Sequence, residues 1–292
     1  MRSRGFTLVE LVMVIAITGI IAAIVTIFLK RTVDGYFDAG RRAGLIDMAD
    51  TALRRMGRDV RSAVPNSIRR PSDQCFELLP SSTGGRYRMG PDIVNDNAPG
   101  CVPSATCAAP LDITQPVTTF DTLSPLSTTP AIGDWVVIDN QNPNDAYGAG
   151  VNRGAIAAVG ASPLAAFGTA RISVTAGTVF PNGYDGGRFV VVPNNGGNPA
   201  VFYVCDGAGI SGGTGTGTLY RVVRPFAAAY PAACPGVAGA AILASHVSSC
   251  TFVYDPSHGA TQQSGFVWLQ LELTEANETV SLSHGAHVEN VP

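Results

Sequence analysis

The sequence predicts an α+β protein in which one long N-terminal helix packs on an antiparallel β-sheet head with long loops. Two observations carry this prediction. A stretch without any charged residue extends from Leu11 to Leu29, and apolar residues continue beyond it at helical spacing. After Pro71 the pattern changes to short, strand-like apolar stretches separated by loops rich in glycine and proline, which together account for 53 of the 292 residues.

The apolar stretch is long enough to cross a membrane. A helix over Phe6–Leu29 would measure about 36 Å, which exceeds the thickness of a hydrocarbon core. The stretch is too long for the apolar part of a secretory signal peptide, and Lys30-Arg31 follows it where a small-residue cleavage site would be expected. A plain membrane anchor fits the length but leaves Glu10 unexplained, because an unpaired acid in hydrocarbon costs about 2.5 kcal/mol or more.

Glu10 belongs to a recognisable motif. The residues Gly5-Phe6-Thr7-Leu8-Val9-Glu10-Leu11 resemble the processing site of type IV pilins and type II secretion pseudopilins. The resemblance implies that residues 1–5 are a leader peptide, which prepilin peptidase removes by cleaving between Gly5 and Phe6 before Phe6 is N-methylated. It also implies that Glu10 of one subunit pairs with the Phe6 amine of a neighbour and sets the register of a filament.

The same resemblance implies a location and a set of partners. The chain would first cross the inner membrane once, with a cytoplasmic N-terminus and a periplasmic head, and would later become part of a pilus. Residues 6–29 would form the transmembrane and filament-core helix. Its partners would be prepilin peptidase and other major and minor pilins.

Residues 30–64 predict an amphipathic continuation of the same helix. Pro65 ends it, so a single helix is expected over Phe6–Ala63. Its apolar or small positions are Val33, Phe37, Gly40, Leu45, Ala49, Ala52, Leu53, Met56, Val60 and Ala63. We expect the helix glycines to allow close packing against a sheet, with a hinge as the alternative; these are Gly35, Gly40, Gly44 and Gly57.

Residues 65–292 predict a β-rich head, and Val267–Leu273 alternates strictly between apolar and other side chains. The expected strands are Cys75–Leu79, Asp134–Asp139, Arg171–Thr175, Arg188–Val192, Val201–Cys205, Leu219–Val223, Ser249–Tyr254, Phe266–Leu273 and Thr279–Ser283. We expect Pro193–Pro199 to be a hairpin loop and Glu275–Glu278 to be a turn. Residues 81–131 and 140–168 predict long irregular connections or small inserted hairpins.

All the cysteines follow the apolar stretch. They are Cys75, Cys101, Cys107, Cys205, Cys234 and Cys250. An even number confined to the exported part indicates disulfides formed in an oxidising compartment. Six cysteines allow 15 pairings, and the sequence does not choose among them. Cys205–Cys234 and Cys101–Cys107 are two pairs that could each close a loop.

The head offers no catalytic constellation, so we expect neither an enzyme nor a cofactor. His284 and His287 would face opposite sides of a strand, which disfavours a shared metal. The oxygen-rich run Asp139–Asp145 lacks the glycine and the distal glutamate of a calcium-binding EF-hand loop, and predicts a turn. Residues 71–292 hold 7 basic and 16 acidic side chains, a net −9, which makes nucleic acid an unlikely partner.

A narrower resemblance extends beyond the first motif. Four stretches resemble the MshO-type minor pilins of the mannose-sensitive haemagglutinin (MSHA) pilus, which are related to the J-type minor pseudopilins. They are Val60–Arg69, Leu219–Val222, His246–Phe252 and His287–Pro292. The resemblance implies a minor pilin that acts in pilus assembly, priming or tip structure. The alternatives are a minor pseudopilin of a type II secretion system and a tip adhesin that binds a surface glycan.

Overall fold

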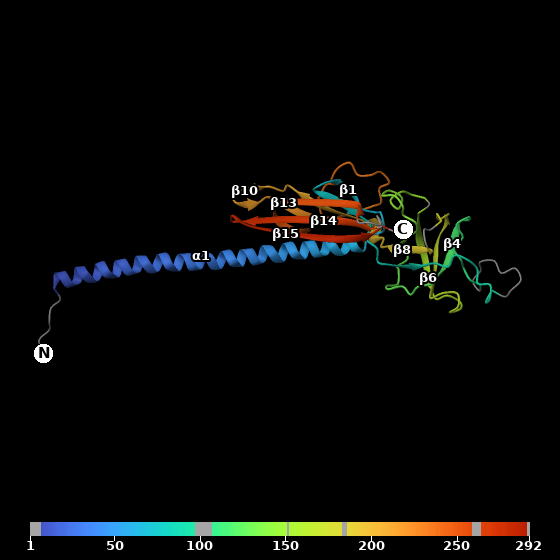
Figure 1. Cartoon of the computed structure of the whole chain (residues 1–292), viewed down its shortest axis with the longest axis horizontal. Helices are drawn as coiled ribbons and strands as arrows, with labels where there is room; N and C mark the ends of the chain where they lie inside the picture. Colours follow the sequence, from blue (N-terminus) through green and yellow to red (C-terminus); the bar gives the residue numbers. More distant parts are fainter. Residues whose placement is uncertain (1–6, 97–106, 151, 183–185, 259–263, 291–292) are drawn as a thin grey trace.

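A single helix and two bodies of β-structure make up the chain (Figure 1). The computed structural model describes residues 7–96, 107–150, 152–182, 186–258 and 264–290. Helix α1 (Leu8–Arg61) has 54 residues and is about 81 Å long at 1.5 Å per residue. It begins at the N-cap Thr7 and ends where the Ser62 amide donates to the Arg58 carbonyl, three residues before Pro65.

The second half of α1 lies on a seven-stranded antiparallel sheet. The strand order is β1-β2-β9-β12-β13-β14-β15. The strands are β1 (Arg69–Ser72), β2 (Cys75–Leu78), β9 (Ala200–Asp206), β12 (Gly217–Arg224), β13 (Ala241–His258), β14 (Ser264–Glu275) and β15 (Glu278–Glu289). The predicted α+β arrangement of a long helix on an antiparallel sheet is therefore confirmed. In β14, Val267, Leu269, Leu271 and Leu273 are buried, as the alternation predicts.

The turn predicted at Glu275–Glu278 joins β14 to β15. Glu275 pairs with Glu278 in the register of these strands, and the two residues between them have positive φ, 50° at Ala276 and 68° at Asn277. A two-residue loop with both φ values positive is the turn whose twist suits adjacent antiparallel strands.

A second, six-stranded sheet forms the end of the molecule that lies farthest from the N-terminus (Figure 1). Its order is β3-β8-β5-β6-β7-β4. The strands are β3 (Thr83–Arg86), β8 (Arg188–Val192), β5 (Trp135–Val137), β6 (Arg153–Gly160), β7 (Ala170–Thr178) and β4 (Val117–Thr122). A bridge between Tyr87 and Thr122 joins its two edges, and the amides of Arg88 and Leu123 extend this pairing. The sheet thus closes into a small barrel around Phe120, Phe189 and other buried apolar residues.

The barrel differs from two expectations. Residues 81–131 and 140–168 do not form only irregular connections or separate hairpins, because they supply β3, β4 and β6 of the barrel. The segment Pro193–Pro199 is not a hairpin loop either. It contains the short 3-10 helix η1 (Asn195–Gly197) and passes from β8 in the barrel to β9 in the large sheet. A small hairpin, β10 (Ile210–Ser211) with β11 (Thr214–Gly215), completes the elements.

The barrel and the large sheet share a small apolar core. Val64 and Leu79 from the sheet side pack with Val137, Val192 and Tyr147 from the barrel side. Next to this core lies the fully buried Arg69, whose guanidinium carbon is 3.5 Å from the centroid of the Tyr147 ring. Apolar packing and one buried cation therefore join the two bodies.

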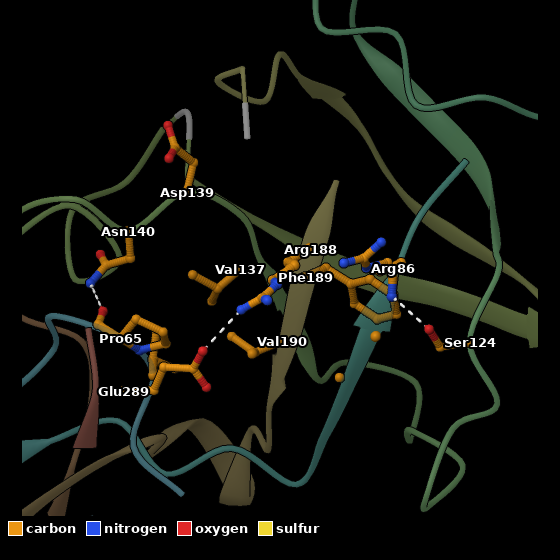
Figure 2. A pocket seen from close by; sticks show the side chains of 13 residues that line it. Pro65, Arg86, Ser124, Val137, Asp139, Asn140, Arg188, Phe189, Val190 and Glu289 are labelled. Atoms are coloured by element: carbon orange, nitrogen blue, oxygen red, sulfur yellow. Dashed lines mark hydrogen bonds and ion pairs between the residues drawn. The ribbon is translucent and has the colours of Figure 1, made fainter. Parts of the chain in front are cut away.

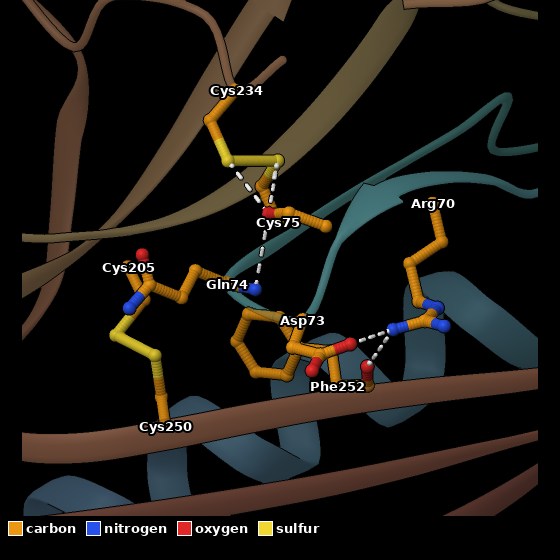
Figure 3. The surroundings of a disulfide bond; sticks show 9 residues. Arg70, Asp73, Gln74, Cys75, Cys205, Cys234, Cys250 and Phe252 are labelled. Atoms are coloured by element: carbon orange, nitrogen blue, oxygen red, sulfur yellow. Dashed lines mark hydrogen bonds and ion pairs between the residues drawn. A yellow bond between two sulfur atoms is a disulfide. The ribbon is translucent and has the colours of Figure 1, made fainter. Parts of the chain in front are cut away.

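Two disulfides are placed in the large sheet (Figure 3). Cys75 of β2 pairs with Cys234 in the connection between β12 and β13, and Cys205 of β9 pairs with Cys250 of β13. The suggested pair Cys205–Cys234 is therefore wrong, because the fold brings Cys250 to Cys205, with 6.6 Å between their Cα atoms, although β12 lies between β9 and β13 in the sheet order. Cys107 is also disulfide-bonded, while the suggested pair Cys101–Cys107 lies partly outside the described residues. Disulfide formation in the head is thus confirmed.

Candidate assembly site on the N-terminal helix

Glu10 lies in the first turn of α1. Thr7 caps this turn, because its Oγ1 accepts a hydrogen bond of 3.3 Å from the Glu10 amide. The Glu10 side chain is exposed, and within the part of the chain that the structure describes no basic group forms an ion pair with it. A carboxylate in the first turn suits the positive end of the helix dipole. Gly5 and Phe6, the other two residues of the predicted processing site, lie outside the described residues.

The surface around and beyond Glu10 is apolar and uncovered. Every large apolar side chain from Leu8 to Leu29 is between 47% and 78% exposed. The two hydroxyls on this stretch donate to the helix's own carbonyls, from Thr18 to Val14 over 2.6 Å and from Thr26 to Ala22 over 2.7 Å. Helix α1 is long and apolar enough to cross a membrane, by length and composition. Apart from Glu10, this half presents no charged group before Lys30.

Contact between the helix and the head begins at Leu45. From there to the helix end, the predicted apolar positions are buried against β13, β14 and β15. They are Leu45, Ala49, Ala52, Leu53, Met56 and Val60. Val33 and Phe37 were expected on the same face but are 48% and 58% exposed. The amphipathic spacing is therefore present before Leu45, yet the sheet does not extend far enough along the helix to cover it.

The helix glycines divide in the same way. A Cβ built on Gly57 would lie 2.5 Å from Nε2 of His284 on β15, so this glycine allows close packing, as expected. Gly35, Gly40 and Gly44 have no atoms within 4 Å of such a Cβ. The expectation that these three pack against a sheet of the same chain is therefore wrong.

A polar contact fixes the helix to the middle of the sheet. Asp59 accepts a hydrogen bond of 2.6 Å from the Tyr203 hydroxyl and one of 3.2 Å from Nε of Arg221. Burial of the Tyr203 ring, and then the nearby Asp59 carboxylate, raise the pKa of the Tyr203 hydroxyl. Sequence reasoning did not identify this group, since Asp59 is more than 140 residues away from both of its partners in the chain. Asp59 stands out only as an acid on an otherwise arginine-rich stretch.

The other polar candidates have ordinary partners. Both oxygens of Asp139 accept hydrogen bonds from the Gln141 amide, and Asp145 accepts from the backbone and side chain of Asn142. The run Asp139–Asp145 is therefore a hydrogen-bonded turn, as predicted. His284 faces Gly57, whereas the His287 ring packs 4.9 Å from the ring of Phe266, in line with opposite faces of β15. Among the described residues, no group of three His, Cys, Asp or Glu side chains is arranged to hold a metal.

The comparisons with known proteins bear on the first residues of the chain. The prokaryotic N-terminal methylation motif matches residues 1–26. The chain has a type IV pilin-like N-terminus. No curated protein and no solved structure matched the chain. The motif implies processing by prepilin peptidase and association with other pilins, and together with the apolar half of α1 it is consistent with a membrane-anchored pilin.

Proposed function

We propose that this pilin-like chain is a minor pilin of an MSHA-like type IV pilus, of the MshO type. It acts in pilus assembly, priming or tip structure, and not as an enzyme. The observation that carries the proposal is the single carboxylate, Glu10, within the motif and on the stretch Leu8–Leu29, which is otherwise uncharged and is uncovered. Such a helix suits first a bilayer and then the core of a filament.

The physical argument concerns the transfer of the helix from lipid to filament. Lipid tails are as apolar as the helix surface, so the hydrophobic effect does not drive this transfer, and close packing and charge pairing must do so. Prepilin peptidase, by cutting after Gly5, creates an ammonium group on Phe6, and methylation keeps its charge. A Glu10 carboxylate that meets this ammonium on a neighbouring subunit has the partner that its own chain lacks, and only one stagger of the helices allows the pairing.

The uncovered glycines agree with assembly through the same helix. Gly35, Gly40 and Gly44 have open space around them in the isolated subunit. Small residues allow helices to approach closely, and they are enriched where helices associate in an apolar environment. We infer that neighbouring subunits occupy this space in the filament.

The position of the barrel favours a subunit at the tip. The barrel extends the head at the end farthest from the N-terminus (Figure 1). A head of this length is difficult to repeat densely along a thin fibre, whereas at the tip it is unobstructed. This position also supports the second candidate function, a tip adhesin that binds a surface glycan.

The experiment uses Glu10→Ala, with Asp34→Ala as the matched control. Asp34 is an exposed acid on the same helix, beyond the apolar stretch. We expect Glu10→Ala to be inserted in the inner membrane and processed at a normal rate, but to be recovered in sheared pili at a tenth of the wild-type amount or less, about 1.4 kcal/mol of assembly free energy. Asp34→Ala should assemble normally, and normal recovery of Glu10→Ala would refute the pairing.

Two further results test the processing site and the system to which the chain belongs. A bulky residue in place of Gly5 should leave the chain unprocessed, visible as an unshifted band, while cleavage of such a variant would contradict the assigned processing site. Deletion of the gene for this chain should reduce the number of pili. Loss of protein secretion with normal pili would instead assign it to a type II secretion system.

A further inference from the structure

A cavity of about 280 Å³ lies where the barrel meets the large sheet (Figure 2). We propose that it binds a small molecule with a short apolar or aromatic body and one carboxylate. This volume is close to the lower end of the range that small-molecule sites show, about 300–1,000 Å³, which suits a ligand with a single ring. Junctions between two folded bodies are common positions for such sites.

The floor of the cavity is apolar. Val64 comes from the segment just after α1, Val137 from β5, and Phe189 and Val190 from β8. Gly84 and Gly85 of β3 form part of the wall without side chains. Apolar atoms provide most of the surface, so a polar ligand without an apolar body would lose its hydration here without compensation.

The charged residues at the rim determine the sign of the charge that the ligand carries. Glu289 is already paired, since its Oε1 accepts a hydrogen bond of 3.0 Å from Arg188. The Asp139 carboxylate is held by Gln141, and Figure 2 shows it directed away from Arg86. Asn140 is also satisfied, because it donates to Pro65 and accepts from Ala146. Both lining acids and this amide therefore have partners within the chain.

Arg86 remains as the available cation. Among the described residues, its guanidinium makes no hydrogen bond or ion pair, and it lies over Gly186, where no side chain intervenes. The Ser124 hydroxyl, which also lines the cavity, accepts a hydrogen bond of 3.2 Å from the backbone amide of Arg86, and it donates none to any described residue. A guanidinium and a hydroxyl at the edge of an apolar cavity together match a carboxylate on an apolar body.

The test measures binding of 3-phenylpropionate to the purified full chain in detergent micelles, by ligand-observed NMR with empty micelles as the blank. We expect saturable binding with a dissociation constant of about 1 mM, as the small size of the probe dictates. The neutral 3-phenylpropionamide and the ring-free propionate should each bind at least about tenfold more weakly, because each lacks one of the two recognised features. Equal binding of the acid and the amide would overturn the inference.

Variants locate the site. Arg86→Gln should weaken binding of 3-phenylpropionate about tenfold, whereas Arg55→Gln, which removes an exposed charge from α1, should leave it unchanged. Val190→Trp, which fills the cavity, should abolish binding, with near-ultraviolet circular dichroism confirming that both variants are folded. Unchanged binding in Arg86→Gln and Val190→Trp would contradict the assignment.

The result of the binding experiment does not depend on the proposed function. The chain is unassembled in this experiment, so a failure of Glu10 to direct pilus assembly would not affect it. Binding that disappears as the protein concentration rises would show that a second copy covers the cavity, and would overturn the small-molecule assignment.

Discussion

Arg69 is the first residue of β1 and lies at the junction between the sheet and the barrel. Its side chain is fully buried and makes two hydrogen bonds to Glu77, one of them 2.8 Å long. It also donates to Oδ1 of Asn144 and to the carbonyls of Ala227 and Ala229, at 3.0–3.1 Å. Replacement by methionine keeps much of the volume and removes all of these contacts.

The magnitude follows from the Glu77 carboxylate, which is fully buried as well. Breaking a buried ion pair from one side costs about 3–5 kcal/mol, because the remaining charge stays out of water without a partner. Arg224 can compensate only in part, since its Nε is 3.7 Å from the other oxygen of Glu77. We therefore expect Arg69→Met to lower the free energy of unfolding by about 3–5 kcal/mol at neutral pH.

The control is the next residue in the chain. Arg70 forms an ion pair with Asp73, whose side chain is 71% exposed, and donates a hydrogen bond of 3.1 Å to the Phe252 carbonyl, so Arg70→Met should cost only about 1–2 kcal/mol. The assay is urea unfolding of the full chain, followed by tryptophan fluorescence, which reports on Trp135 in β5 next to the junction core together with Trp268 in β14. An Arg69→Met variant no less stable than Arg70→Met would refute the reasoning.

The loss should also depend on pH. Burial raises the pKa of Glu77, while the charges and hydrogen bonds of Arg69, with a smaller effect of Arg224, lower it. Without Arg69 the folded-state pKa rises further above the unfolded value, so the folded state binds the proton more tightly. Stability then increases as the pH falls through the folded-state pKa. The deficit of Arg69→Met should therefore be smaller near about pH 5 than near about pH 8, and a deficit that grows with acidification would contradict this assignment.

Three further predictions concern separate features. Met56→Ala, at a fully buried helix position, should lower the free energy of unfolding in urea by about 2–5 kcal/mol. Met13→Ala, at a position that is 60% exposed, should leave the unfolding midpoint unchanged. Equal effects of the two variants would show that the sheet does not cover Met56. Replacing both Cys205 and Cys250 by serine removes a link between residues 45 apart in sequence and should lower the free energy of unfolding by about 2–4 kcal/mol. An unchanged urea midpoint under oxidising conditions would contradict that pairing. Ala276→Gly, at a φ of 50°, should raise the melting temperature through a gain of about 0.5–1 kcal/mol, and a lower melting temperature would show that the turn does not strain alanine.

The features that the sequence determines are local. The uncharged stretch, the motif around Glu10 and the proline after the helix predict the bounds of α1 to within two residues at each end. Alternation predicts which side of β14 is buried, because neighbouring side chains on a strand must point to opposite faces. The helix part of the candidate assembly site could be predicted for the same reason, since its exposed apolar surface and its acid belong to one continuous segment.

The features that only the tertiary structure decides join distant residues. The edges of the barrel meet at Tyr87 and Thr122, and the strands involved are short or rich in glycine, so they carry little periodic signal. The disulfide pairing follows from the tertiary structure, which brings Cys250 to Cys205 although β12 lies between their strands in the sheet order. Arg69 resembles any surface arginine in the sequence, and only the fold encloses it between Glu77 and Tyr147. The extent of the sheet along α1 also decides where the exposed half ends, because identical apolar spacing is buried after Leu45 and uncovered before it.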